Sequence, residues 1–271
     1  MTVKTTLLSL LFCGLPICST AAWAASSPLL DKPVREIQLP LPPPPDVPDA
    51  KPMLTCWYYS RFMIKQLDAG EKGASELAIV PFGSGRPEPV CRDGTDSNEH
   101  VIQDWSGYFW GVKGDYVLFH ADDSVNGGMG FAVFSAASYR KLHTGIMSDH
   151  SLRTLQLLAP ASTRGTDPRI ALPPPALLMR YRSHYLAPCS LRSNLSACWG
   201  TIRRVLNLGQ AAAPDCNKAY AIQEQQAPAQ YKRAAASNPT VITYEAEAVI
   251  DGSGALRLSA ASPTTKCFPA E

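Results

Sequence analysis

Residues 108–135 read YFWGVKGDYVLFHADDSVNGGMGFAVFS, and their pattern decides the fold class. Three runs, 108–110, 115–120 and 131–135, are rich in aromatic and β-branched residues, a composition typical of strands. Short glycine-containing segments separate the runs, which predicts antiparallel hairpins. We interpret residues 121–130, with their aspartates, asparagine and glycines, as a turn-rich insert between two strands.

The same pattern continues outward on both sides of this stretch. Two helices are predicted in the second half, one capped by Asn194 or Ser196 and one capped by Asp215. The sequence therefore predicts a β-rich α+β fold of antiparallel sheets, sandwich-like or in two small lobes, with two short helices in the C-terminal half. The further strand-like runs are 54–67, 76–82, 152–158, 177–186 and the final hairpin 240–250 with 255–259.

The first 24 residues have the pattern of a secretory signal. Lys4 precedes an apolar stretch from Leu7 to Ile17, and Ala22-Trp23-Ala24 is a small-x-small cleavage sequence. The apolar stretch is too short to be a good membrane span, and no later apolar run is long enough for one. We therefore expect a soluble protein that is periplasmic or secreted after cleavage near Ala24.

Proline marks two further boundaries. Residues 25–50 carry a dense proline tract that ends in Pro42 to Pro45, and we interpret them as a disordered or extended spacer that adds little to the core. Residues 159–176 are also proline-rich and long for a connection within one domain. They divide a β-rich lobe at 51–158 from an α+β lobe at 177–271, although the two lobes could form one domain.

The charge of the chain excludes some partners. The formal net charge is +2, and removal of residues 1–24 takes away Lys4 and no acidic residue. A protein with a net charge so close to zero is not expected to have the basic surface that binds nucleic acids. We expect a protein or glycan partner in the cell envelope instead.

Six cysteines remain after the signal. An even number in an exported chain predicts three disulfides rather than a metal site, since no Cys-x-x-Cys pair is present. Pairing within lobes predicts Cys56–Cys91. Three connectivities remain for the other four cysteines, and we favour Cys189–Cys198 with Cys216–Cys267.

The insert at 121–130 contains the candidate site residues. Asp122, Ser124 and Asn126 alternate before a glycine, as oxygen ligands do in calcium loops. The match is partial, because Val133 stands where such loops carry their last carboxylate. Turn residues in a hairpin explain the same pattern, so we expect no cofactor, with Ca²⁺ as the alternative.

The remaining motifs do not define a reaction. No nucleophile elbow, zinc-binding helix, phosphate loop or dinucleotide fingerprint is present. We therefore expect a binding or structural module rather than an enzyme. The alternative is a hydrolase of an envelope polymer, with His120 and Asp122 or Asp123 as an acid–base pair within residues 120–126.

Overall fold

The computed structural model describes residues 29–83, 85–148, 151–159, 174–226 and 237–270. The predicted signal and most of the predicted proline-rich connection lie outside these residues. Within them the chain forms two antiparallel sheets and two helices. The strands are β1 (Arg35–Pro40), β2 (Met53–Tyr58), β3 (Phe62–Asp68), β4 (Glu76–Pro81), β5 (His100–Val101), β6 (Tyr108–Lys113), β7 (Tyr116–Val125), β8 (Gly128–Ser135), β9 (Lys141–Ser148), β10 (Thr154–Leu158), β11 (Ala176–Leu186), β12 (Thr240–Ile250) and β13 (Leu256–Pro269). The helices are α1 (Leu195–Val205) and α2 (Asn217–Gln226).

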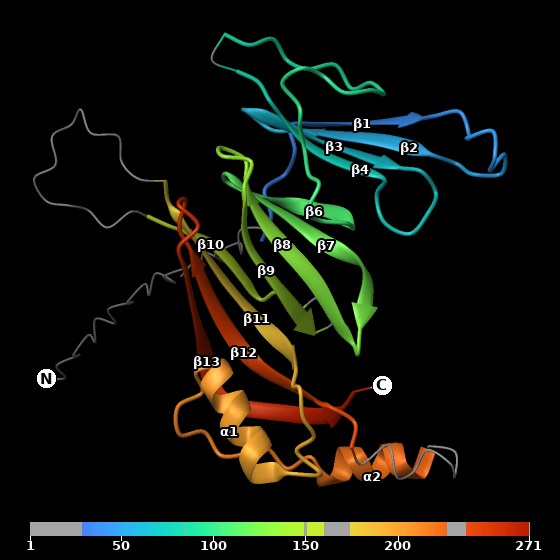
Figure 1. The fold of residues 1–271 in the computed structure, drawn as a ribbon. Coiled ribbons are helices and arrows are strands. Elements are labelled where there is room, and N and C mark those ends of the chain that lie inside the picture. Colours follow the sequence, from blue (N-terminus) through green and yellow to red (C-terminus); the bar gives the residue numbers. More distant parts are fainter. Residues whose placement is uncertain (1–28, 84, 149–150, 160–173, 227–236, 271) are drawn as a thin grey trace, which may run out of the picture.

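The two sheets divide the strands in chain order. Strands β1 to β5 form a five-stranded sheet in sequential order, and the eight-stranded sheet has the order β13-β12-β11-β9-β8-β7-β6, with β10 paired to β11. Figure 1 shows the five-stranded sheet over one end of the longer sheet and the two helices at its other end. The predicted β-rich fold with two helices in the C-terminal half is confirmed.

Alternation along the strands produces three apolar clusters. The first lies between the sheets, where Phe62 and Ile64 of β3 pack with Phe119 of β7. The second lies on the opposite face of the eight-stranded sheet, where Trp199 and Ile202 of α1 cover it. The third covers the outer face of the five-stranded sheet and includes the Cys56–Cys91 disulfide. The five-stranded sheet is therefore buried on both faces.

Local sequence explains the helices. The Asn194 side chain accepts a hydrogen bond from the Ala197 amide at 3.2 Å and so caps α1 as predicted. Arg203 and Arg204 lie in the last turn of α1, where cations suit the helix dipole. Before α2, Asp215 accepts a hydrogen bond from the Asn217 amide at 2.9 Å.

Several predicted elements differ from the structure. β9 lies where no strand was predicted, and β13 continues to Pro269 instead of ending at residue 259. The run 54–67 is two strands, because the chain reverses at Tyr59, whose amide donates to the Phe62 carbonyl. The insert 121–130 is not a loop, because β7 continues to Val125. Only Asn126 and Gly127 turn the chain, and both have positive φ, which is typical of two-residue hairpin turns.

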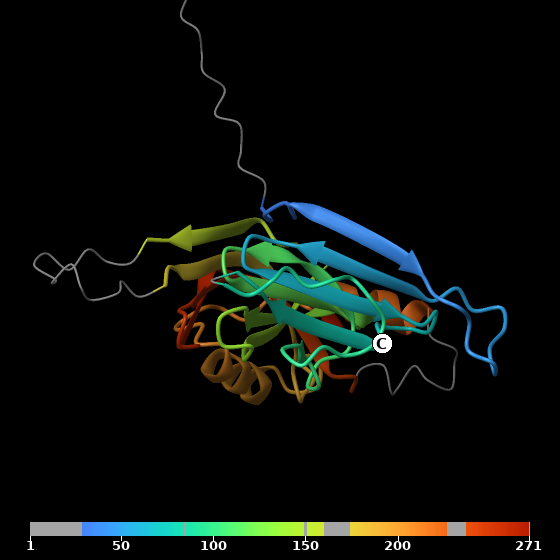
Figure 2. The same ribbon diagram turned by 90° about the horizontal axis from the view of Figure 1, so that it is seen from above.

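The spacer prediction for residues 25–50 is wrong where β1 lies. β1 pairs antiparallel with β2 over six residues and forms the edge of the five-stranded sheet, as Figure 2 shows from above. Ile37, Leu39 and Leu41 pack against the outer apolar cluster. An edge strand tolerates a proline because one of its sides needs no ladder hydrogen bonds. The proline tract begins only where β1 ends.

Three disulfides link the chain. They join Cys56 to Cys91, Cys189 to Cys198 and Cys216 to Cys267, which are the three pairs that we predicted. Cys56 belongs to β2 and Cys91 to the segment between β4 and β5, so the first bridge fastens this segment to the sheet. Both members of every pair lie on the same side of the proline-rich connection.

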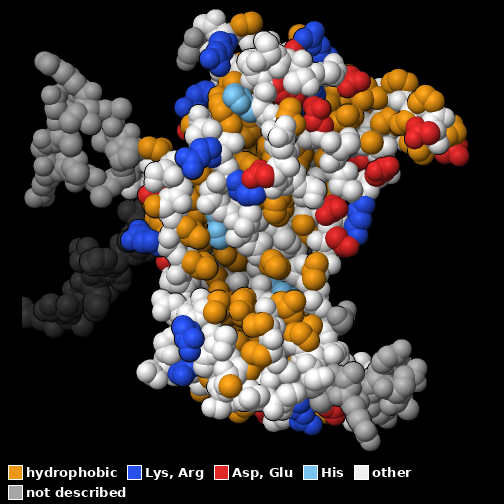
Figure 3. All heavy atoms as spheres, in the orientation of Figure 1, with side chains coloured by type: hydrophobic (Ala, Val, Ile, Leu, Met, Phe, Trp, Pro, Cys, Tyr) orange, Lys and Arg blue, Asp and Glu red, His pale blue; other side chains and the backbone are white. Residues whose placement is uncertain are grey.

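The distribution of surface charge and the length of the helices are relevant to binding of nucleic acids and membranes. In the view of Figure 3, acidic and basic side chains are interspersed, and no large area of one sign is visible on this face. Neither described helix has the length and apolar character required to cross a membrane.

Candidate functional site

The predicted site residues lie along β7 and its turn. Between His120 and Ser124 the pairing with β8 shifts register, so that three β7 residues face Gly130 alone. Such bulges re-aim side chains. Asp122 and Ser124 precede this hairpin end, and Asn126 is the first turn residue.

The contacts of these residues are local. The carboxylate of Asp123 pairs with Lys72 and accepts a hydrogen bond from the Ser124 amide, so the pKa of Asp123 is lowered, with Lys72 as the main cause. The Nδ1 atom of His120 lies 2.8 Å from the Ala121 carbonyl oxygen. In the described part of the chain, no hydrogen bond joins His120 to Asp122 or Asp123.

The described residues contain no cluster of the usual metal-binding side chains. Among the described residues, no group of three or more His, Cys, Asp or Glu side chains has an arrangement that could hold a metal ion. The role of Asp122, Ser124 and Asn126 as ligands therefore stays a prediction.

The structure shows a groove that sequence reasoning missed. It lies at the turn between β2 and β3, where a hollow of about 430 Å³ adjoins another of about 260 Å³, and both share Val34, Tyr59 and Ser60. The first hollow continues to Phe82 and Glu88, and the second continues to residues beside β6 and β7. We call this surface the turn groove. Its lining residues are Asp31, Lys32, Val34, Arg35, Tyr58, Tyr59, Ser60, Arg61, Phe62, Phe82, Glu88, Val112, Gly114 and Asp115.

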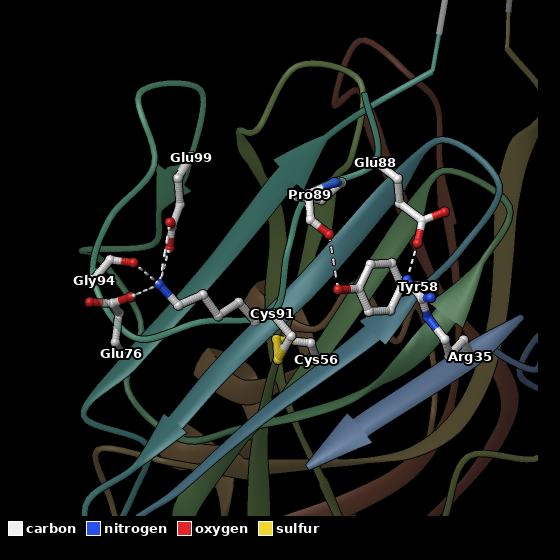
Figure 4. Close-up of a disulfide and its surroundings, with 10 residues drawn as sticks. Arg35, Cys56, Tyr58, Glu76, Glu88, Pro89, Cys91, Gly94 and Glu99 are labelled. Carbon is white, nitrogen blue, oxygen red and sulfur yellow. Dashed lines mark hydrogen bonds and ion pairs between the residues drawn. A yellow bond between two sulfur atoms is a disulfide. The ribbon is translucent and has the colours of Figure 1, made fainter. Parts of the chain in front are cut away.

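One wall of the turn groove is held by Arg35. Its guanidinium forms an ion pair with Glu88 and lies 4.1 Å from the centre of the Tyr58 ring. The Tyr58 hydroxyl donates to the Pro89 carbonyl at 3.0 Å. Figure 4 shows these residues side by side across β1, β2 and the segment after β4. Three separate parts of the chain therefore meet in this wall.

The other wall is held by Asp31. Its carboxylate accepts hydrogen bonds from Lys113 at 3.0 Å and from the Gly114 amide at 2.7 Å. Arg61 forms an ion pair with Asp115 close by. The aromatic side chains of Tyr59 and Phe62 line the floor between these walls, and both are buried. Burial raises the pKa of Tyr59, with further contributions from the charges of Asp31 and Glu36. The tyrosine is therefore neutral at physiological pH.

Val34 is the apolar side chain that solvent reaches in the turn groove. It is 80% exposed, although its amide is held by a hydrogen bond to the Tyr58 carbonyl. A fixed backbone with an exposed branched side chain presents apolar surface at little entropic cost. In the sequence, the alternation of Ile37, Leu39 and Leu41 is the pattern that indicates β1, the strand that carries Arg35 and so the first wall of the groove.

A second polar cluster lies on the outer face of the five-stranded sheet. The Lys65 ammonium contacts the Gly94 carbonyl at 2.6 Å, the Glu99 carboxylate at 3.0 and 3.3 Å, and Glu76 Oε1 at 3.1 Å. Burial alone lowers the pKa of Lys65, but the hydrogen bonds to Glu99 and the negative charges of Glu99 and Glu76 outweigh burial and raise it. We call Lys65, Glu76 and Glu99 the lysine cluster. With Cys56–Cys91, it fixes the segment between β4 and β5.

Comparison with known proteins adds no family. No family model, curated protein or solved structure matches the chain. The candidate sites are therefore defined by their own geometry and chemistry.

Proposed function

We propose that this protein is an exported binding module that holds an extended peptide segment of a partner protein in the turn groove. The predicted signal and the three disulfides support a location outside the cytoplasm. The groove is the observation that carries the proposal, because it combines an exposed valine, an apolar floor and walls of both charge signs.

The composition of the turn groove favours a peptide over other ligands. Nucleic acids and acidic glycans require walls of one charge sign, whereas Arg35 and Lys32 lie beside Glu88 and Asp115 here. Protein interfaces have apolar centres that polar residues surround. Val34 and Tyr59 line both hollows and provide apolar surface between the charged walls, and a peptide with one apolar side chain between charged residues complements it.

Selection of peptides tests the proposal. A displayed library of random peptides is screened against the full chain with its disulfides formed, and the dissociation constants of selected peptides are measured. Val34→Glu places a charge in the centre of the groove, and we expect at least about tenfold weaker binding, since about 1.4 kcal/mol of lost contact has that effect.

Val205→Glu is the matched control. Val205 lies in α1, is 58% exposed, and belongs to the end of the molecule opposite the five-stranded sheet (Figure 1). Binding should be unchanged in this variant. Selected peptides that bind Val34→Glu as tightly as the unchanged protein would contradict the proposal, and so would a screen in which glycans bind and peptides do not.

A further inference from the structure

The lysine cluster has the features of a site for covalent chemistry. Lys65 lies in β3, between Cys56 of β2 and Ala78 of β4, and its side chain is 4% exposed. The side chain of Glu99 is 1% exposed. Figure 4 shows Glu76, Gly94 and Glu99 converging on one amine nitrogen. A primary amine and a carboxyl group are therefore held together away from bulk water.

We propose that Lys65 and Glu99 form an intramolecular amide bond after the chain folds. The Lys65 nitrogen lies 3.0 Å and 3.3 Å from the two oxygens of Glu99. The carboxyl carbon is bonded to both of these oxygens, so a small movement of the nitrogen brings the two reacting atoms to the separation of about 3–3.5 Å that a near-attack geometry requires. Groups held in this way react with effective molarities of about 10⁵ M or more, which favours condensation over the separated groups.

The reaction balances without an added reactant. A proton passes from the ammonium of Lys65 to a Glu99 oxygen, which leaves an amine beside a carboxylic acid. The nitrogen attacks the carboxyl carbon and forms the C–N bond. A second proton leaves the nitrogen, the hydroxyl of Glu99 departs with a proton, and one water molecule is released. No atom is oxidised or reduced.

The first proton transfer stays inside the cluster. The hydrogen bonds that raise the pKa of Lys65 oppose loss of its proton to solvent. Transfer to Glu99 is a different step, because the total charge of the cluster does not change. The contact ion pair is the resting state, because Glu99 and Glu76 hold the proton on Lys65. The neutral amine and carboxylic acid form from it as a transient pair, and this pair reacts.

Glu76 is placed to act as the general base. Its Oε1 atom lies 3.1 Å from the Lys65 nitrogen, as an ion pair. The same oxygen is buried and has no hydrogen-bond partner of good geometry among the described residues. It can therefore take the proton from the attacking nitrogen and return it to the departing hydroxyl. The side chain of Glu76 is 25% exposed, so the released water has a short path to solvent.

Peptide mapping of the full chain tests the amide. After reduction and digestion with trypsin, an amide at Lys65 blocks cleavage there and joins the peptide 62–72 to the peptide 93–113. We expect this joined pair, lighter than the sum of the two peptides by one water, about 18 Da. Fragmentation should locate the link between Lys65 and Glu99.

Two variants serve as controls. Lys65→Met replaces the apolar part of the lysine side chain by one of similar length and removes the amine, and it should give the peptides unlinked. Glu76→Gln keeps both reacting groups and removes the base, and the linked fraction at a fixed time after refolding should fall at least tenfold. Cleavage after Lys65 in the unchanged protein, with no linked peptide, would overturn the proposal. Loss of water confined to Asp93-Gly94 would also overturn it.

Discussion

At the scale of single residues, the buried His143 makes the stability of the protein depend on pH. His143 of β9 packs edge-on against Phe131, with 5.5 Å between ring centres, and its Nε2 atom is buried without a hydrogen bond among the described residues. Burial lowers the pKa of His143 to about 4. The folded state therefore holds this imidazole in its neutral form.

The lowered pKa predicts destabilisation in mild acid. The unfolded chain binds a proton at His143 near pH 6.5, whereas the folded chain does so only near pH 4. The contribution of neutral His143 to the free energy of unfolding is fully present above pH 6.5 and decreases as the pH falls towards 4. At pH 5 the loss is about 2 kcal/mol. Urea denaturation at pH 7 and pH 5 measures this loss, which should be smaller in His143→Asn. The exposed His100→Asn should behave as the unchanged protein, and an equal loss in both variants would contradict the prediction.

Replacement of glycine by alanine should have opposite effects on stability at Gly107 and Gly200. Gly107 precedes β6 with φ +134°, and a Cβ there would overlap the His120 carbonyl oxygen and lie 2.9 Å from Ala121 Cα. Gly107→Ala should destabilise the protein by about 3 kcal/mol or more, because backbone must move. Gly200 lies inside α1 with open space around it, so Gly200→Ala should stabilise by about 0.5–1 kcal/mol. Thermal unfolding of the two variants measures the difference, and equal melting temperatures would contradict the prediction.

At the scale of elements, β1 is the part for which the structure differs most from the prediction, because residues interpreted as a spacer form a strand of the sheet. Its residues pair with β2, its apolar side chains cover the outer cluster, and the preceding Asp31 reaches β6 through Lys113. Residues 31–40 thus connect the five-stranded sheet, the eight-stranded sheet and the turn groove. A spacer would make none of these contacts.

Truncation measures the contribution of β1. A chain that begins at residue 42 loses Ile37, Leu39 and Leu41 from the outer cluster. We expect it to be less stable than a chain that begins at Leu29 by about 2–5 kcal/mol, from partial burial of three aliphatic side chains. Urea denaturation of the two chains gives the difference. Equal midpoints would restore the spacer interpretation.

At the scale of the whole molecule, the core crosses the predicted lobe boundary. Tyr116, Leu118 and Phe131 precede residues 159–176, and they share one cluster with Tyr181 and many residues that follow. The Tyr116 hydroxyl lies within hydrogen-bond distance of the Pro175 and Ile250 carbonyls, at 2.9 and 3.1 Å. The eight-stranded sheet likewise contains strands from both sides of the boundary.

This shared core predicts one cooperative unfolding transition. Neither half can keep its share of the cluster buried when the other half unfolds, so no stable intermediate is expected. Urea denaturation followed by far-ultraviolet circular dichroism and by tryptophan fluorescence should give coincident curves, since Trp57 and Trp199 lie on opposite sides of the boundary. Two separate transitions would support two independent lobes.

The sequence alone determined the features that depend on neighbouring residues. The α1 cap needs only Asn194 and the residues after it, and the hairpin of β12 and β13 needs only alternation and the turn at Asp251. Pairing within lobes predicted Cys56–Cys91, and the structure has this pair together with the two pairs that we favoured among the other four cysteines.

Only the tertiary structure decided where distant residues meet. Arg35, Tyr58 and Glu88 form one wall of the turn groove, and Lys65 meets Glu99 across the outer face of a sheet. No periodicity records these contacts, because they depend on strand order and register rather than on spacing along the chain. β1 was missed although Ile37, Leu39 and Leu41 alternate, because the proline tract that follows favours an extended spacer and the pairing with β2 is visible only in the structure.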